Sequence, residues 1–176
     1  MPKTKRENQE CIVRGKKCES IFGESSTCFI ASPDSCEVAL ELEIIKQKLD
    51  AAGIEPYIAV EKQEPQKDIF CEKICSKIIE SQFCIVILKE VAEKPNANVY
   101  YEYGLMTAFN KKIIPIRPEG QSLAFNIRNL DTPGYTEENL GTKMEDAIKK
   151  MIEEEEAENV QHISNFLVMT GPSFLE

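Results

Sequence analysis

The sequence predicts an α/β fold of the flavodoxin-like type, a three-layer sandwich built on a five-stranded parallel sheet. Short apolar runs typical of buried strands alternate with segments whose apolar residues recur every three or four positions, as in amphipathic helices. The alternation repeats about five times, which requires a parallel sheet with helices on both faces and right-handed crossovers. The strand order 2-1-3-4-5 is the most economical arrangement of these elements.

The individual elements follow from the same two patterns. Strands are expected at residues 27–31, 56–60, 83–88 and 112–117, with a fifth near Leu130. Helices are expected at about residues 38–52, 68–81 and 99–110, and from Glu137 onward into the acidic run 153–156. Gly53 fits the left-handed residue that commonly follows a helix end.

Length and charge limit the classes of function. The 176 residues suit one domain, which we place at residues 26–158, between a polar N-terminal arm (1–25) and a C-terminal tail (159–176). The net charge of −9 disfavours nucleic acid as a partner, because the phosphate backbone requires clustered Lys and Arg. No segment reaches the roughly 18 continuous apolar residues of a membrane span. We therefore expect no nucleic-acid or membrane partner.

The cysteines and the single histidine limit the kinds of metal site and catalytic site that this chain can form. Seven cysteines without a regular spacing, and a polar N-terminus without a secretory signal, favour reduced thiols in a cytoplasmic protein. Cys36, Cys71, Cys75 and Cys84 are expected inside helices and strands. A metal site at Cys11, Cys18 and Cys28 matches no common zinc spacing, so we predict no metal and no resident cofactor. Because His162 is the only histidine, carboxylates are the best candidates for hydrolytic chemistry.

The predicted topology brings two loops together at the carboxyl edge of the sheet, where open α/β sheets bind ligands. One is residues 32–35 after the first strand, and the other is residues 89–98 after the third. The second loop leads into a helix that carries Glu102. The candidate ligand contacts at this edge are Ser32, Pro33, Asp34, Asn96, Asn98, Tyr101 and Gly104.

These residue types suit a ribosyl group. Breaking the bond between a ribose and its base creates an oxocarbenium-like centre, which a carboxylate such as Glu102 can stabilise or attack. Carboxamides can hold sugar hydroxyls, and Tyr101 or Tyr103 can stack on a base. The alternatives are that Glu102 is a solvated first-turn glutamate, that Asn98 is only a helix N-cap, and that Asp34 caps the helix that follows it rather than binding a ribose hydroxyl.

Three segments resemble the group of TIR-like and nucleoside 2-deoxyribosyltransferase-like predicted nucleotide-binding proteins. The most specific is residues 96–104 (NANVYYEYG), which is similar to the Asn-Pro-Asn-Val-aromatic-Tyr-Glu-Leu-Gly motif of that group. Residues 28–33 (CFIASP) and 125–130 (FNIRNL) are similar to its opening strand and to its Phe-Asp-Ile-Arg segment. The likeness covers residues 27 to about 152.

The resemblance implies a flavodoxin-like fold, a nucleotide or nucleoside ligand such as NAD, and a glutamate at Glu102 that acts on the N-glycosidic bond. Deoxyribosyltransferases carry Asp-Gly-Thr where this chain has residues 97–99 (ANV), which disfavours deoxyribosyl transfer itself. Two hypotheses follow. One is an enzyme of the N-glycosidic bond, and the other is a TIR-like nucleotide sensor or interaction module without turnover. Self-association is left open. A phosphoacceptor receiver domain is disfavoured because Lys89 follows the third strand.

Overall fold

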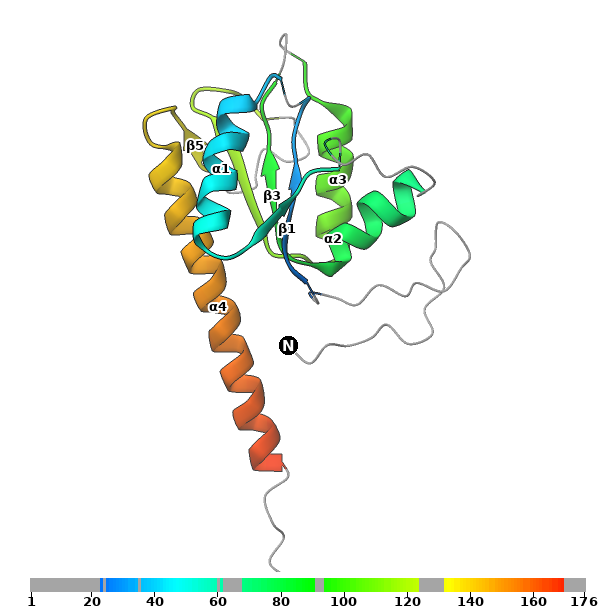
Figure 1. The fold of residues 1–176 in the computed structure, drawn as a ribbon, viewed down its shortest axis with the longest axis vertical. Coiled ribbons are helices and arrows are strands. Elements are labelled where there is room, and N and C mark those ends of the chain that lie inside the picture. Colours follow the sequence, from blue (N-terminus) through cyan, green and yellow to red (C-terminus); the bar gives the residue numbers. More distant parts are fainter. Residues whose placement is uncertain are drawn as a thin grey trace, which may run out of the picture.

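A five-stranded parallel sheet with the order β2-β1-β3-β4-β5 forms the centre of the molecule (Figure 1). The computed structural model describes residues 23, 25–34, 36–59, 61, 68–90, 94–123 and 132–169, with the side chains of 155, 156 and 158–169 excluded. The strands are β1 Ser25–Ala31, β2 Glu55–Tyr57, β3 Ser81–Ile87, β4 Ile113–Pro118 and β5 Gly134–Tyr135. The predicted fold class and strand order are both confirmed.

Helices cover both faces of this sheet. They are α1 Ala39–Ala51, the π-helix η1 Ile69–Cys75, α2 Ser76–Glu80, α3 Ala97–Ala108 and α4 Leu140–Met169. Figure 1 shows α1 and α4 on one face and α2 and α3 on the other. The carboxyl ends of the strands gather at the upper edge of the sheet in that view.

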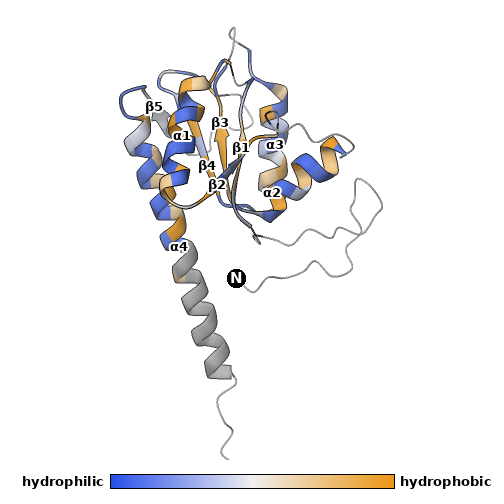
Figure 2. Cartoon of the chain, in the orientation of Figure 1, coloured by the Kyte–Doolittle hydropathy of each residue, from blue (hydrophilic) through white to orange (hydrophobic). Residues whose placement is uncertain are grey.

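Each face of the sheet has its own apolar cluster. One cluster joins β1 and β3 to the inward residues of α1 and α4, including Leu42, Ile45 and Met144. The other joins the opposite sides of β1 and β3 to Ile78 of α2 and to Val99 and Met106 of α3. Figure 2 shows apolar and polar residues alternating along these helices, as expected for helices with one buried face. Burial on both faces explains why the central strands read as continuous apolar runs rather than alternating ones.

The two central strands, β1 and β3, leave the sheet toward opposite faces. β1 and β3 are hydrogen-bonded neighbours, with Phe29 opposite Cys84 and Ala31 opposite Val86. The chain leaves β1 toward α1 on one face and leaves β3 toward α3 on the other. The loops after these strands therefore start side by side at a topological switch point.

Local departures from the expected elements have physical causes. The predicted helix at 68–81 begins as the π-helix η1, whose wider turn changes the period of the buried face. Cys75 and Ile78 are buried there, whereas Cys71 is only half-buried. The edge strand β2 is shorter than residues 56–60, since it pairs with β1 alone.

The fifth strand lies at Gly134–Tyr135 rather than near Leu130, which falls outside the described residues. It pairs with the end of β4, where Arg117 lies opposite Gly134. The Arg117 side chain donates from Nε to the carbonyl of Thr132 at 3.3 Å, just before the strand. The register of β5 is thus fixed by contacts with β4, and no local sequence pattern predicts these contacts.

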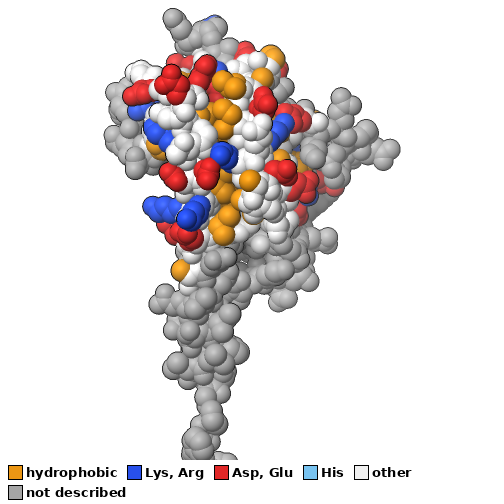
Figure 3. Space-filling model, turned by 60° about the vertical axis from the view of Figure 1, so that its left-hand side comes forward, with side chains coloured by type: hydrophobic (Ala, Val, Ile, Leu, Met, Phe, Trp, Pro, Cys, Tyr) orange, Lys and Arg blue, Asp and Glu red, His pale blue; other side chains and the backbone are white. Residues whose placement is uncertain are grey.

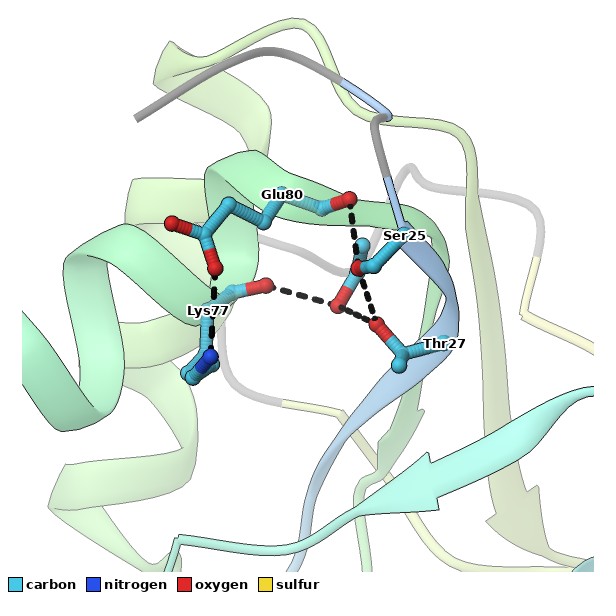
Figure 4. Close-up of polar contacts among 5 residues, drawn as sticks. Ser25, Thr27, Lys77 and Glu80 are labelled. Carbon is cyan, nitrogen blue, oxygen red and sulfur yellow. Dashed lines mark hydrogen bonds and ion pairs between the residues drawn. The ribbon is translucent and has the colours of Figure 1, made fainter. Parts of the chain in front are cut away.

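Hydroxyl groups close the amino edge of the sheet, opposite the switch point (Figure 4). Ser25 Oγ donates to the carbonyl of Glu80 at 3.0 Å and lies 2.7 Å from the hydroxyl of Thr27. Ser81 Oγ donates to the carbonyl of Lys77 at 2.6 Å. These bonds tie the start of β1 to the end of α2, so the amino edge is occupied by structural contacts.

The ends of the chain lie mostly outside the description. Residues 1–22, which include Cys11, Cys18 and most of the predicted polar arm, are not described. The helix α4 continues to Met169, well beyond the acidic run at which we expected a solvated helix end. Within the described part, no helix is both long enough and apolar enough to cross a membrane.

Candidate functional site

The first turns of α3 pack over the carboxyl ends of the two central strands. Val99 belongs to the same buried cluster as Ala31 at the end of β1 and Leu88 just after β3. Val99, Tyr103 and Met106 recur at helical spacing and form the buried face of α3. Glu102 lies three residues after Val99, at the border of this face. The helix therefore holds Glu102 at the edge of the sheet that the topology assigns to ligands.

Burial sets the electrostatic character of Glu102. Its side chain is half-buried, and loss of hydration raises the pKa of the carboxyl group to about 7. None of the described residues forms a hydrogen bond or ion pair with it. The interpretation of Glu102 as a fully solvated first-turn glutamate is therefore wrong. A carboxyl group with this pKa exists in both protonation states near neutral pH, and its ionised form lacks a compensating charge.

The two asparagines before Glu102 have different roles. Asn96 is the N-cap of α3, because its Oδ1 accepts from the backbone N–H of Asn98 at 3.1 Å and of Val99 at 3.3 Å. Asn98 is therefore not the cap. Its side chain is exposed and lies one turn before Glu102 on the same flank of the helix. Asn98 is thus the carboxamide that remains available beside Glu102.

The tyrosines of α3 divide between core and surface, as their spacing requires. Tyr103 is buried, and Tyr101 is 53% exposed. The Tyr101 ring lies 6.0 Å from that of Phe70 in η1, with an interplanar angle of 46°. Tyr101 is thus the more exposed of these two tyrosine rings. Gly104 is exposed, and an added Cβ would meet nothing within 4 Å, so no close protein neighbour requires glycine there.

The loop after β1 offers a buried hydroxyl. Ser32 Oγ is inaccessible to solvent and has no hydrogen-bond partner in the described part of the chain. Pro33 beside it is buried, and Asp34 is exposed. A buried hydroxyl without a partner costs free energy, which a ligand that bonds to it can recover.

Asp34 begins a turn rather than a helix. Its Oδ1 accepts from the backbone N–H of Cys36 at 3.3 Å, and its carbonyl accepts from that of Glu37 at 2.9 Å. The helix α1 starts only at Ala39, with Val38 as an N-cap that makes no side-chain bond. The expectation that Asp34 caps α1 is therefore wrong. Cys36 in this turn is exposed, which corrects its predicted place inside a helix or strand.

A buried polar cluster lies at the same edge, on the α1 side of the sheet, and our sequence analysis missed it. Glu41 in the first turn of α1 is only 6% exposed. Its Oε1 accepts from Lys89 Nζ and from the Tyr135 hydroxyl, each at 2.7 Å. Burial opposes ionisation of Glu41, but the bonds from Lys89 and Tyr135 outweigh it and hold the pKa below its ordinary value. A glutamate next to the apolar Leu42 in the helical pattern was the only local signal.

The exit of β3 is fixed by a second set of contacts. Gln121 Nε2 donates to the carbonyl of Leu88, and its Oε1 accepts from the backbone N–H of Glu90 at 2.9 Å. Arg117 Nη1 donates in turn to the carbonyl of Gln121. The residues that follow β3 are therefore held in place on one side by Gln121 and on the other by the Lys89–Glu41 pair.

Among the described residues, no group of three or more His, Cys, Asp or Glu side chains could hold a metal ion. The five described cysteines are free, and three of them, Cys28, Cys75 and Cys84, are buried. Burial raises the pKa of the Cys84 thiol to about 12 and also raises that of Cys28. These thiols belong to the core rather than to a reactive site.

The fold was compared with known proteins. No family model matches the sequence, and no curated protein matches it significantly. Among solved structures, the TIR domain of the Toll-related receptor TRR-2 from Hydra magnipapillata aligns with a TM-score of 0.56 at 16% identity. The alignment covers 72% of this chain and 97% of that domain. The chain has a TIR-like fold.

A second structure shares this fold. The CMP N-glycosidase BcmB of Clostridium botulinum aligns with a TM-score of 0.52 at 22% identity, over 67% of the TIR-like chain and 97% of the glycosidase. At these identities the likeness concerns the fold alone. It confirms, at that level, the resemblance drawn from the sequence segments. The segment 125–130 lies outside the described residues.

Proposed function

We propose that this protein binds a nucleotide or nucleoside at the carboxyl edge of its sheet and that Glu102 acts on the N-glycosidic bond of that ligand. The observation that carries the proposal is the state of Glu102. It is half-buried, has a pKa raised to about 7, and has no partner among the described residues. A carboxylate that the fold leaves uncompensated is suited to a cation that forms only during the reaction.

The proposed mechanism uses the ionised form of Glu102. As the bond from the anomeric carbon to the base breaks, positive charge develops on the sugar, and the carboxylate stabilises it or forms a covalent bond to that carbon. Attack of water then completes hydrolysis. Partial desolvation strengthens the attraction between the carboxylate and the developing charge.

The surrounding residues position the ligand in this proposal. Asn98, one turn from Glu102, holds a sugar hydroxyl, and the exposed ring of Tyr101 stacks on the base. Ser32 Oγ gains its missing hydrogen bond from the ligand, and Asp34 accepts from a ribose hydroxyl. Asn96 contributes through the cap that orients α3 rather than through direct contact. We further expect Pro33, on the loop after β1, and Gly104, on α3, to border the ligand.

The fold neighbours agree with this proposal without establishing it. One is an enzyme that acts on the N-glycosidic bond of CMP. Because the sequence identity is low, the substrate does not transfer to this chain. CMP and NAD are therefore the first two compounds to test, together with a panel of nucleosides.

The direct test is release of free base. The protein is incubated with CMP, NAD or a nucleoside, and the products are separated by chromatography. We expect release by the wild-type protein and loss of about a hundredfold or more in Glu102→Gln. Glu43→Gln is the matched control, because Glu43 is an exposed glutamate of α1 whose side chain accepts a hydrogen bond from Gln47 and from no other described residue. Equal release by wild type and Glu102→Gln would show that Glu102 has no part in the reaction.

A second candidate is a TIR-like nucleotide sensor or interaction module without turnover. The likeness to a receptor TIR domain and the replacement of Asp-Gly-Thr by residues 97–99 (ANV) favour it. It predicts that CMP, NAD or a nucleoside raises the thermal midpoint of the protein while no base is released. The same panel therefore separates the two functions.

A further inference from the structure

A groove opens on the face formed by α1 and α4, near the end of α1. Its volume is about 430 Å³. Ala52, Ile148 and Ile152 supply apolar lining, and Glu145, Lys149 and Glu153 supply charge. Because α1 starts at the carboxyl edge of the sheet and runs to the opposite edge, this groove is distinct from the site of Glu102 (Figure 1).

The charges beside the groove alternate along α4. Glu145, Lys149 and Glu153 follow each other at intervals of four residues and so lie on one side of the helix, next to Ile148 and Ile152. Glu145 is paired with Lys48 of α1 at 2.6 Å. Lys149 and Glu153 are 3.8 Å apart, with side chains 74% and 63% exposed. This second pair is loose, and both of its members remain available to another molecule.

The helix that carries this surface is longer than its partner. α4 has 30 residues and α1 has 13. At about 1.5 Å per residue, α4 reaches well past the end of α1, as Figure 1 shows. Helices in proteins owe most of their stability to packing. A helix that continues beyond its intramolecular partner, with an apolar groove at the point of departure, has a surface that a further helix can cover.

We propose that a second copy of this chain docks on this groove, with the two α4 helices antiparallel around a two-fold axis. In that arrangement Ile152 of each copy enters the groove of the other, and Lys149 of each copy meets Glu153 of the other. A two-fold interface requires a surface that is complementary to itself. Glu145, Lys149 and Glu153 alternate in charge beside Ile148 and Ile152. Turned by a two-fold axis, this surface places opposite charges against each other and isoleucine against isoleucine, so it is complementary to itself. Figure 3 shows apolar side chains between basic and acidic ones on this face.

Charge argues against other occupants. A uniformly acidic partner would meet Glu145 and Glu153, and a uniformly basic one would meet Lys48 and Lys149. Like charges brought together at an interface are strongly unfavourable. A partner with alternating charge matches both, and another copy of this helix is such a partner.

The oligomeric state of the full chain tests the proposal. Light scattering after size exclusion, up to about 100 μM protein, is expected to give the mass of a dimer. Ile152→Glu places a charge in the apolar centre and is expected to give a monomer, with circular dichroism confirming that it folds. Glu43→Lys, an exposed charge change elsewhere on α1, is expected to leave the dimer unchanged.

A charge exchange shows whether the pairing is between copies. Lys149→Glu and Glu153→Lys are each expected to weaken self-association at least tenfold, since each brings like charges together. Mixing the two variants is expected to restore association. In the mixed dimer, the acidic side chain introduced at position 149 of one copy meets the basic side chain introduced at position 153 of the other. The unchanged Glu153 of the first copy meets the unchanged Lys149 of the second. A monomeric wild type at all concentrations, a dimeric Ile152→Glu, or a mixture that fails to associate would each overturn the proposal. None of these results depends on the proposed reaction at Glu102.

Discussion

Two glutamates at the carboxyl edge of the sheet show how a fold assigns different tasks to the same side chain. Glu41 on α1 is buried and receives bonds from Lys89 and Tyr135, which keep its pKa low. Glu102 on α3 is half-buried without such donors in the described structure, and its pKa is raised to about 7. Glu41 is thus a permanently charged anchor at neutral pH, whereas Glu102 remains chemically available. Environments that push the pKa values of two carboxyl groups apart are typical of acid and base assignments.

The largest expected effect on stability is that of removing the anchor. Glu41→Ala leaves the Lys89 ammonium and the Tyr135 hydroxyl without their acceptor, and should lower the free energy of unfolding by about 2 to 3 kcal/mol. Urea unfolding measures this loss. Glu43→Ala, on the exposed side of the same helix, should stay within about 0.5 kcal/mol of wild type. Similar losses in the two variants would mean that the Glu41 cluster is not a structural unit.

A smaller effect of opposite sign is expected at Glu102. Because its pKa is raised in the folded state, folding favours the protonated form. The contribution to stability is full below about pH 4.5 and is lost as the pH rises through about 7. Glu102→Gln, which cannot ionise, should therefore match wild type near pH 4. Above pH 8 it should be more stable by about 1 to 2 kcal/mol, after allowance for solvent screening.

Urea unfolding of Glu102→Gln and wild type at several pH values checks this sign. A variant that is less stable than wild type at pH 8 would contradict the description of Glu102 as an uncompensated carboxyl group.

A variant that lacks the Tyr135 hydroxyl distinguishes the contributions of the two donors to Glu41, which are Lys89 and Tyr135. Tyr135→Phe removes one of the two donors to Glu41 Oε1 while the ring stays in the core. The expected loss in unfolding free energy is about 1 kcal/mol, smaller than for Glu41→Ala, since Lys89 still neutralises the carboxylate. Thermal unfolding of the two variants side by side measures the ratio. A loss as large as that of Glu41→Ala would assign the whole effect to Tyr135.

The smallest contrast concerns the asparagines before Glu102. Asn96→Ala removes the N-cap of α3 and should destabilise the protein by about 0.5 to 1 kcal/mol. Asn98→Ala should change the stability by less, because the side chain is exposed and makes no bond with the described residues. On ligand binding the order should reverse. Calorimetry with CMP or NAD and thermal unfolding of the two variants test both statements.

The sequence predicted those parts of the molecule that depend on local patterns. Apolar runs and helical periodicity predicted the sheet order, the helices and the position of Glu102 near the carboxyl edge. These patterns are clear in the sequence because strands that are buried on both faces are continuously apolar. The sequence offered Asn98 as the N-cap of α3, whereas the cap is Asn96, two residues earlier. It depends on where the helix begins, which propensity alone does not determine.

The Glu41 cluster could not be predicted in the same way. It joins residues of α1, the β3 exit and β5, and Tyr135 lies in a two-residue strand that is defined only by its pairing with β4. Long-range hydrogen bonds of this kind leave no periodic signal. The π-turns of η1 were missed for a related reason, since the apolar spacing of residues 71–78 fits an ordinary helix equally well.

If the Glu102 carboxylate acts on the glycosidic bond, as we propose, the pH dependence of base release from CMP and NAD should follow its ionisation. We expect kcat/KM to rise with pH along a curve whose midpoint lies near pH 7, as Glu102 ionises, and Glu43→Gln to follow the same curve. A rate that stays constant between pH 5 and 9, or a rise confined to pH values near 4.5, would contradict it.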